Sequence, residues 1–197
     1  AGGMSQEEYA RIASDSAHPL LNRVVSGLYP AGSTIKPFIA LAALSEQLIE
    51  PDTSFVSSGG ISVGDWFFPD WKAGGHGATN VVKALAESVN TFFYVIGGGY
   101  GNFKGLGIER IVAYLRSFGF GARLGVDLPG EGKGFLPTPD WKEKNLGEKW
   151  YIGDTYNVSI GQGNLLVTPL QIAAGTSAIA NGGALYRPHI LGDKNTQ

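Results

Sequence analysis

A short stretch, Tyr29–Phe38, places the strongest constraint on how this chain can fold. Pro37 is tolerated in the first turn of a helix but not in its interior, so a helix that contains it must begin just before it. Apolar residues then recur with the i, i+3, i+4, i+7 spacing of one buried helix face, at Ile35, Phe38, Ile39 and Ala42. We therefore expect a helix that begins at Ser33 or Thr34, with one of these hydroxyls as its cap, and runs to about Leu48.

Ser33 and Lys36 lie three residues apart, which places them on the same face of that helix, one turn from each other. A serine hydroxyl becomes a good nucleophile when a nearby base takes its proton, and a lysine is such a base when burial or a positive field lowers its pKa. A helix start supplies such a field and directs N–H groups at a developing oxyanion. The pair predicts a nucleophile with its base, although a capped helix with a surface lysine has the same pattern.

A second polar pair, Ser88 and Asn90, follows in a short connection between two predicted helices. In an extended tripeptide, residues i and i+2 lie on one side, so this hydroxyl and this carboxamide face the same way. Ser88 is placed to relay a proton between Lys36 and a leaving amine, and Asn90 is placed to hold Lys36 and a substrate amide. A capped turn between helices also explains the tripeptide.

The composition is that of a globular protein with a substantial core. Of the 197 residues 43% are hydrophobic, and 15 basic residues are interspersed with 17 acidic ones, so no basic patch favours nucleic acid. No apolar run is long enough to span a membrane. Cysteine is absent, which excludes disulfides and a thiol nucleophile.

Periodicity and capping residues predict the remaining helices. Thr168-Pro169-Leu170-Gln171 combines a cap, a proline at the first helical position and a glutamine at the third, which is a good start signal. We also expect helices over 5–12 with Ser5 as the cap, from Thr79 or Asn80, from about 92 to 97, and over 108–115.

Other segments are expected to be non-helical. The β-branched and aromatic residues of 61–68 predict a strand or hairpin, and 184–191 has the pattern of a strand. His18 precedes a proline, which favours an extended backbone. The charged and aromatic segment 142–154 is expected to be exposed.

Ser-x-x-Lys at Ser33, followed by Ser-x-Asn at Ser88, resembles the active-site motifs of penicillin-binding proteins and serine β-lactamases. Other stretches resemble the class B penicillin-binding proteins of the elongation type, penicillin-binding protein 2, and together they cover nearly the whole chain. They are 19–23, 29–37, 70–77, 127–131, 161–171, 179–183 and 188–189. On these motifs the chain is identified as a member of that family.

The resemblance implies an α+β fold of the penicillin-binding protein and serine β-lactamase type, with helices packed on an antiparallel sheet, and D,D-transpeptidase activity on peptidoglycan without a cofactor. In that family the serine attacks the penultimate D-alanine carbonyl of a stem peptide that ends in D-Ala-D-Ala, and β-lactam antibiotics acylate the same serine. Carried over, Ser33 is the nucleophile, Lys36 is the base, and Ser88 and Asn90 form the second motif. Ser33, Ser88 and Asn90 also contact the substrate.

The chain departs from the family in several places. The third family motif, Lys-Thr-Gly or Lys-Ser-Gly, is absent, since Lys72-Ala73-Gly74 precedes Ser88 and Lys194-Asn195-Thr196 lacks the glycine. The family's membrane anchor and pedestal domain are also missing. We therefore expect residues 1–197 to be a soluble part of a transpeptidase domain, truncated at both ends, that reacts with β-lactams weakly or not at all on its own. The resemblance places the intact protein at the outer face of the cytoplasmic membrane, in the periplasm, with a glycosyltransferase of the elongation machinery as a partner.

Some elongation-type relatives bind zinc beside this site through Asp and His residues and a Cys in the middle of Ser-x-Asn. Here that middle residue is Val89, and only Asp65, Asp70 and His76 remain, whereas a zinc site prefers four ligands. We therefore expect no bound metal. Two other functions stay open: a D,D-carboxypeptidase or β-lactamase-like hydrolase, and a non-catalytic module that senses β-lactams or binds partners.

Overall fold

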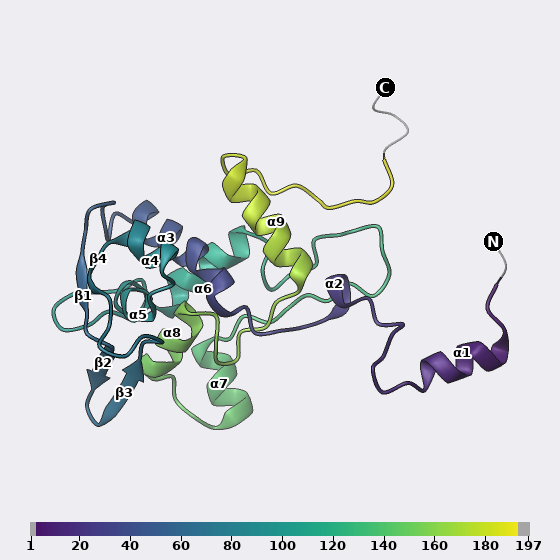
Figure 1. Ribbon diagram of the computed structural model, residues 1–197, viewed down its shortest axis with the longest axis horizontal. Helices are drawn as coiled ribbons and strands as arrows, with labels where there is room; N and C mark the ends of the chain where they lie inside the picture. Colours follow the sequence, from purple (N-terminus) through teal and green to yellow (C-terminus); the bar gives the residue numbers. More distant parts are fainter. Residues whose placement is uncertain (1–2, 193–197) are drawn as a thin grey trace.

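The computed structural model describes residues 3–192, which form helices and short strands connected by loops (Figure 1). The helical elements are α1 (Gln6–Ala13), α2 (Arg23–Ser26), the 3-10 helix η1 (Gly32–Ile35), α3 (Lys36–Ser45), α4 (Val81–Ala86), α5 (Asn90–Gly98), α6 (Gly107–Ser117), α7 (Pro139–Leu146), α8 (Ile152–Ser159) and α9 (Pro169–Ala180). The strands are β1 (Phe55–Ser57), β2 (Gly60–Val63), β3 (Trp66–Pro69) and β4 (Gly77–Thr79).

The strands form two small antiparallel sheets. β1 pairs with β4, with Phe55 opposite Thr79, and β2 pairs with β3 as a hairpin in which Gly60 lies opposite Pro69. Of the strand or hairpin predicted over 61–68, the structure shows the hairpin, and the α+β class and the antiparallel pairing are confirmed. Because both sheets are short, helices supply most of the core in the described part of the chain.

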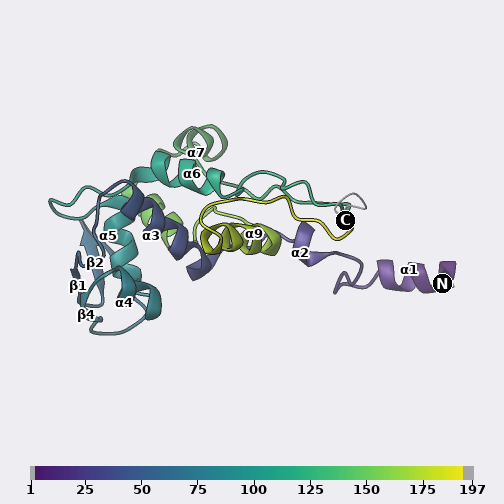
Figure 2. The ribbon, with the colours of Figure 1, turned by 90° about the horizontal axis from the view of Figure 1, so that it is seen from above.

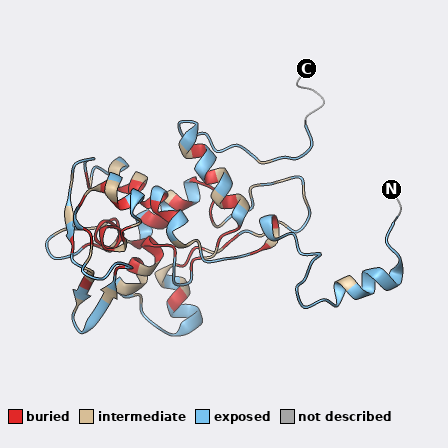
Figure 3. Cartoon of the chain, in the orientation of Figure 1, coloured by how far each residue is buried: buried red, intermediate tan, exposed pale blue. Residues whose placement is uncertain are grey.

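α5 is the buried centre of the body, as Figure 3 shows. α3 and α8 pack against it, and its side chains are apolar almost all round, as expected for a helix that its neighbours surround. Gly97 and Gly98 let α8 approach closely, because a Cβ at these positions would lie 1.8 Å from Ser159 Oγ and 2.4 Å from the Tyr156 ring. This contact joins the C-terminal end of α5 to the C-terminal half of α8.

Several predicted helices begin where their capping residues indicate. Asn80 caps α4 by accepting a hydrogen bond from Lys83 N–H at 3.0 Å. Thr168 and Gln171 form the capping box of α9. α6 includes the predicted 108–115 segment. At α4 and α9, polar side chains therefore determine where the helix begins.

α1 lies apart from the body, at the end of the molecule opposite the sheets (Figures 1 and 2). Ser5 caps it as predicted, accepting a hydrogen bond from Glu8 N–H at 3.1 Å. The extended backbone predicted at His18 is wrong. His18 has a φ of 48°, because its N–H donates to Asp15 O and its carbonyl accepts from Leu21 N–H, which closes consecutive turns.

The segment 142–154 is largely exposed as predicted, but Lys142 is an exception. It is only 6% exposed, because its amine contacts Asp154 at 2.8 Å and Glu148 at 3.3 Å. Burial alone would lower the pKa of Lys142, but the two carboxylates outweigh burial and raise it. An ion pair thus buries a lysine that the charge pattern placed at the surface.

The strand predicted over 184–191 is wrong. The segment runs beside the loop 120–135 (Figure 2) without forming a ladder. The Asp127 carboxylate accepts hydrogen bonds from Ile190 N–H and Leu191 N–H, both at 2.8 Å. A side chain therefore satisfies the backbone groups that a neighbouring strand would otherwise bond. The stretch 194–196, considered above for the third motif, lies outside the described residues.

Candidate active site

Ser33 lies at the start of a helical segment, as predicted, but does not cap it. The segment begins as η1 and continues into α3, which ends at Ser45 rather than near Leu48. No side chain caps η1, and Thr34 Oγ1 instead donates to Ala31 O at 2.6 Å. Ser33 is exposed, and because its hydroxyl does not cap the helix, it is available for other contacts.

Lys36 is only 1% exposed, and its amine lies among oxygen acceptors. Nζ donates to Ser88 O at 2.8 Å, to Ser88 Oγ at 2.9 Å and to Asn90 Oδ1 at 2.7 Å. Burial lowers the pKa of Lys36 to about 8, although the charge of Asp70 opposes this shift. A lysine with that pKa gives up its proton far more readily than an ordinary lysine, so it can act as a base near neutral pH.

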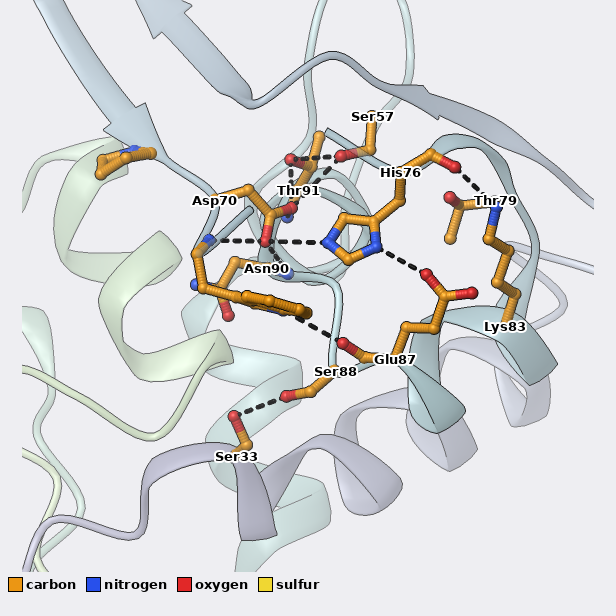
Figure 4. Close-up of polar contacts among 12 residues, drawn as sticks. Ser33, Ser57, Asp70, His76, Thr79, Lys83, Glu87, Ser88, Asn90 and Thr91 are labelled. Atoms are coloured by element: carbon orange, nitrogen blue, oxygen red, sulfur yellow. Dashed lines mark hydrogen bonds and ion pairs between the residues drawn. The ribbon is translucent and has the colours of Figure 1, made fainter. Parts of the chain in front are cut away.

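Ser88 connects Lys36 to Ser33. Its hydroxyl donates to Ser33 Oγ at 2.9 Å (Figure 4) and accepts from Lys36 Nζ at 2.9 Å. In the described structure Lys36 donates no hydrogen bond to Ser33 itself, so the contact suggested by their spacing is replaced by a chain through Ser88. The structure therefore gives Ser88 the central position in a hydrogen-bonded chain from Lys36 to Ser33.

The backbone of Ser88 is in a strained conformation. Its φ is 55°, in the left-handed region, which costs a residue other than glycine about 1–3 kcal/mol and persists only when the surroundings enforce it. In this conformation both the carbonyl oxygen and the hydroxyl of Ser88 reach Lys36 Nζ. The strained backbone of Ser88 is thus linked to the two hydrogen bonds that Lys36 Nζ donates to this residue.

The predicted residues come together at one open hollow of about 770 Å³. Its lining consists of Gly32, Ser33, Trp71, Lys72, His76, Ala86, Glu87, Ser88, Asn90, Ile160 and Gln162. Lys36 is buried behind Ser88 and reaches the hollow through the Ser88 hydroxyl. The structure thus assembles all four residues of the two motifs around a space that can admit a substrate.

Gly161 supports the backbone just before Ser33 in a way that the sequence analysis missed. Gly32 N–H donates to Gly161 O at 2.8 Å, and a Cβ on Gly161 would lie 2.0 Å from Gly32 O. Gly161 also has a φ of 76°, which L side chains rarely adopt. The paired glycines at 161 and 163 were the only sequence signal of this close approach.

Asp70, predicted above only as a remaining metal ligand, has a different set of partners. Its carboxylate accepts hydrogen bonds from the N–H groups of Trp71, Asn90 and Thr91 and from the Thr91 hydroxyl. Burial opposes ionisation of Asp70, but these donors outweigh burial and lower its pKa. Asp70 is therefore an ionised, buried acceptor.

The residues present do not fit the zinc site of some relatives. The described residues contain no group of three or more His, Cys, Asp or Glu side chains placed to hold a metal ion. Asp65 lies in the exposed turn between β2 and β3, and the fully buried Val89 offers no ligand atom. The absence of bound metal stays a prediction.

The family model of the penicillin binding protein transpeptidase domain matches residues 3–196. The chain belongs to this family. The peptidoglycan D,D-transpeptidase MrdA of Haemophilus influenzae is 39% identical over 196 residues, which make up 96% of this chain and 28% of that protein. Among solved structures, a complex of penicillin-binding protein PBP2 with MreC from Helicobacter pylori has a TM-score of 0.87 and 41% identity, covering 100% of this chain and 36% of that one. Pseudomonas aeruginosa PBP2 in complex with WCK 5153 has a TM-score of 0.85 and 35% identity, covering 95% of this chain and 42% of that one.

These similarities confirm the family resemblance and the penicillin-binding protein transpeptidase fold. The chain spans less than a third of the length of the curated relative it matches. No helix in the described residues is long and apolar enough to cross a lipid bilayer.

Proposed function

We propose that this chain carries the nucleophile and the proton-transfer residues of a peptidoglycan D,D-transpeptidase that cross-links stem peptides. The observation that carries the proposal is the hydrogen-bonded chain from Ser33 through Ser88 to the buried Lys36. Family membership and the similarity to a protein named peptidoglycan D,D-transpeptidase support it. We also propose that residues 1–197 are part of a larger transpeptidase domain whose third motif lies elsewhere in the protein.

Acylation requires neutral Lys36. A neutral amine has a lone pair, so Ser88 Oγ–H can donate to Lys36 Nζ and Ser33 Oγ–H can donate to Ser88 Oγ, which reverses the direction of the chain. As Ser33 Oγ bonds to the carbonyl carbon of the penultimate D-alanine, its proton passes to Ser88 Oγ and the Ser88 proton passes to Lys36 Nζ. Gly32 N–H already donates to Gly161 O, so we assign the oxyanion to the next N–H group of the first turn of η1, that of Ser33.

The second half of the reaction uses the same path in reverse. When the bond to the terminal D-alanine breaks, the proton returns from Lys36 through Ser88 to the leaving nitrogen. The amine of a second stem peptide then attacks the ester carbonyl, gives up a proton to Lys36, and forms the new amide while Ser33 Oγ leaves and regains a proton. Asn90 keeps Lys36 in place through Oδ1, and we assign its Nδ2 to the substrate amide.

The substrate in this proposal is a stem peptide that ends in D-Ala-D-Ala, and a β-lactam antibiotic is an inhibitor that acylates Ser33. We place the intact protein at the outer face of the cytoplasmic membrane, facing the periplasm, where its substrate is found. We propose a glycosyltransferase of the elongation machinery as a partner, since a similar solved structure, with 34% identity and a TM-score of 0.82, concerns the structural coordination of polymerization and crosslinking by a peptidoglycan synthase complex.

Mapping of the acylated residue tests the assignment of the nucleophile. The complete protein is labelled with a fluorescent penicillin, digested and analysed by mass spectrometry. We expect a single adduct on Ser33 and no label in the Ser33→Ala variant. An adduct on Ser88 would overturn the assignment.

Separate measurement of acylation and deacylation tests the reaction type. With a D-Ala-D-Ala stem peptide and an acceptor amine, a transpeptidase forms the cross-linked product. A hydrolase releases the shortened acid instead, a sensor stays acylated, and an interaction module does not react. Only the cross-linked product agrees with the proposal.

A further inference from the structure

The buried carboxylate of Asp70 holds the turn that carries Ser88 and Asn90. No side chain of that turn caps α5, so the first N–H groups of α5 need acceptors from elsewhere. Asp70 Oδ1 accepts from Asn90 N–H at 3.1 Å, and Oδ2 accepts from Thr91 N–H at 2.9 Å and from Thr91 Oγ1 at 2.6 Å. Ser57 Oγ donates to the same Oδ2 at 3.3 Å. The Asp70 side chain is fully buried, so water does not compete for these bonds.

The loop 70–76 also holds the backbone on the other side of Ser88. Trp71 Nε1 donates to Glu87 O at 3.0 Å, and His76 Nδ1 lies 2.7 Å from Glu87 Oε2. Figure 4 shows the His76 ring between Glu87 and Asp70, with Nε2 at 3.7 Å from Asp70 Oδ1. One loop therefore makes hydrogen bonds to the residue before Ser88 and to the residues after it.

The hydrogen bonds from the loop 70–76 explain how Ser88 keeps its strained backbone. A left-handed φ at a serine persists only when surrounding contacts enforce it, and its relaxation would turn the Ser88 carbonyl away from Lys36. We propose that Asp70 is a positioning residue, which holds Ser88 and Asn90 in the geometry that the transfer of the Ser33 proton to Lys36 needs. The inference rests on the function proposed above. The described residues of this chain offer no fitting set of zinc ligands, and these hydrogen bonds hold the turn.

Asp70→Asn tests the proposal, with Asp154→Asn as a matched control. Asparagine at 70 replaces one acceptor oxygen by a donor, so an N–H group of α5 loses its partner. Asp154 is also a carboxylate at a helix start, where it accepts from Tyr151 N–H at 2.7 Å, but it does not line the hollow. We expect both variants to lower stability, and only Asp70→Asn to slow acylation at saturating penicillin, by about 10–10²-fold.

The measurements are stopped-flow acylation and urea unfolding of the complete protein. If the parent protein forms no adduct on Ser33, the proposed function fails. If the parent is acylated and Asp70→Asn reacts as fast as Asp154→Asn, the function stands and the role of Asp70 is overturned.

A second pair of variants keeps the charge of Asp70 and covers the case in which Asp70→Asn does not fold. Thr91→Val removes the hydroxyl that donates to Oδ2 at 2.6 Å without changing the size of the side chain, and Thr91→Ser restores that hydroxyl. We expect the valine variant to lower the acylation rate constant while the dissociation constant for penicillin changes less, and the serine variant to recover the rate. A merely structural contact would lower stability in the valine variant with no effect on the rate constant, and that result would overturn the proposal.

Discussion

The substitution Gly161→Ala should damage the site through the backbone of the nucleophile. The new Cβ would lie 2.0 Å from Gly32 O and 2.5 Å from Gly32 N, distances that real Cβ atoms do not show, so the backbone before Ser33 has to move. That movement also breaks the 2.8 Å hydrogen bond from Gly32 N–H to Gly161 O. The left-handed φ of 76° adds a penalty of its own.

The magnitude follows from these three effects. The left-handed backbone costs alanine about 1–2 kcal/mol, the lost hydrogen bond about 1 kcal/mol and the overpacking about 1–3 kcal/mol, so the free energy of unfolding should fall by about 3–6 kcal/mol. A displacement of a catalytic group by about 1 Å can cost about 10²-fold in rate, and we expect acylation of Ser33 to slow by that factor.

Gly163→Ala is the matched control, because Gly163 lies in the same loop as Gly161 and has a φ of 70°. Its Cβ would meet only Asn157 Cβ at 3.4 Å, an ordinary contact, so it has the backbone penalty without the clash. We expect it to lose about 1–2 kcal/mol of stability and to keep its acylation rate. Urea unfolding and stopped-flow acylation with a fluorescent penicillin, both on the complete protein, measure the two effects. Equal acylation rates for the two variants would refute the claim that Gly161 positions Ser33.

Three other predictions concern the base and the metal. Lys36→Ala should slow acylation by about 10²–10⁴-fold in the same assay and Asn90→Ala by less, and a Lys36→Ala variant as fast as the parent would exclude the base role. The acylation rate should rise as pH approaches about 8, because only neutral Lys36 takes the proton. The Asp70 charge raises the pKa of Lys36, so Asp70→Asn should move this rise to lower pH. A pH profile that does not respond to Asp70→Asn would contradict that coupling. Elemental analysis of protein purified without chelator should find far less than one zinc per chain, and stoichiometric zinc would show that the remaining ligands suffice.

The sequence allowed the residues that come together at the site to be predicted better than the contacts between them. The spacing of Ser33 and Lys36 predicted that both residues lie in one helical segment, and the structure confirms this. The path between them depends on Ser88, whose Oγ lies 2.9 Å from both Ser33 Oγ and Lys36 Nζ. That distance depends on a backbone angle at Ser88, which is held by Asp70, so it is a tertiary property that no local pattern contains.

The errors in the fold have a related cause. Apolar residues in 184–191 favour a strand, but a strand also needs a partner, and here the Asp127 carboxylate accepts the N–H groups of Ile190 and Leu191. Lysine is usually a surface residue, but Asp154 stabilises the charge of Lys142 in a buried position. In each case a polar contact between distant segments outweighed a correct local preference. The starts of α4 and α9, whose caps lie within three residues of the groups they bond, were predicted more reliably.

The packing of α5 on α8 connects the core to the site, which leads to a last prediction. Ser88 and Asn90 stand at the start of α5, and Gly161 follows the end of α8, so the contact between these helices sets the distance between the two supports of Ser33. In Gly97→Ala the new Cβ would lie 1.8 Å from Ser159 Oγ and 2.6 Å from Ser159 Cβ, which pushes α8 away.

The expected effects on stability and on rate differ. Overpacking costs about 1–3 kcal/mol, but alanine in place of glycine favours a helix by about 1 kcal/mol, so the net loss of stability should be small. Acylation should nevertheless slow by at least about tenfold, because the supports of Ser33 move apart. The same unfolding and acylation assays measure both quantities. If the rate is unchanged while the helices are forced apart, the supports of Ser33 do not depend on the packing of α5 on α8.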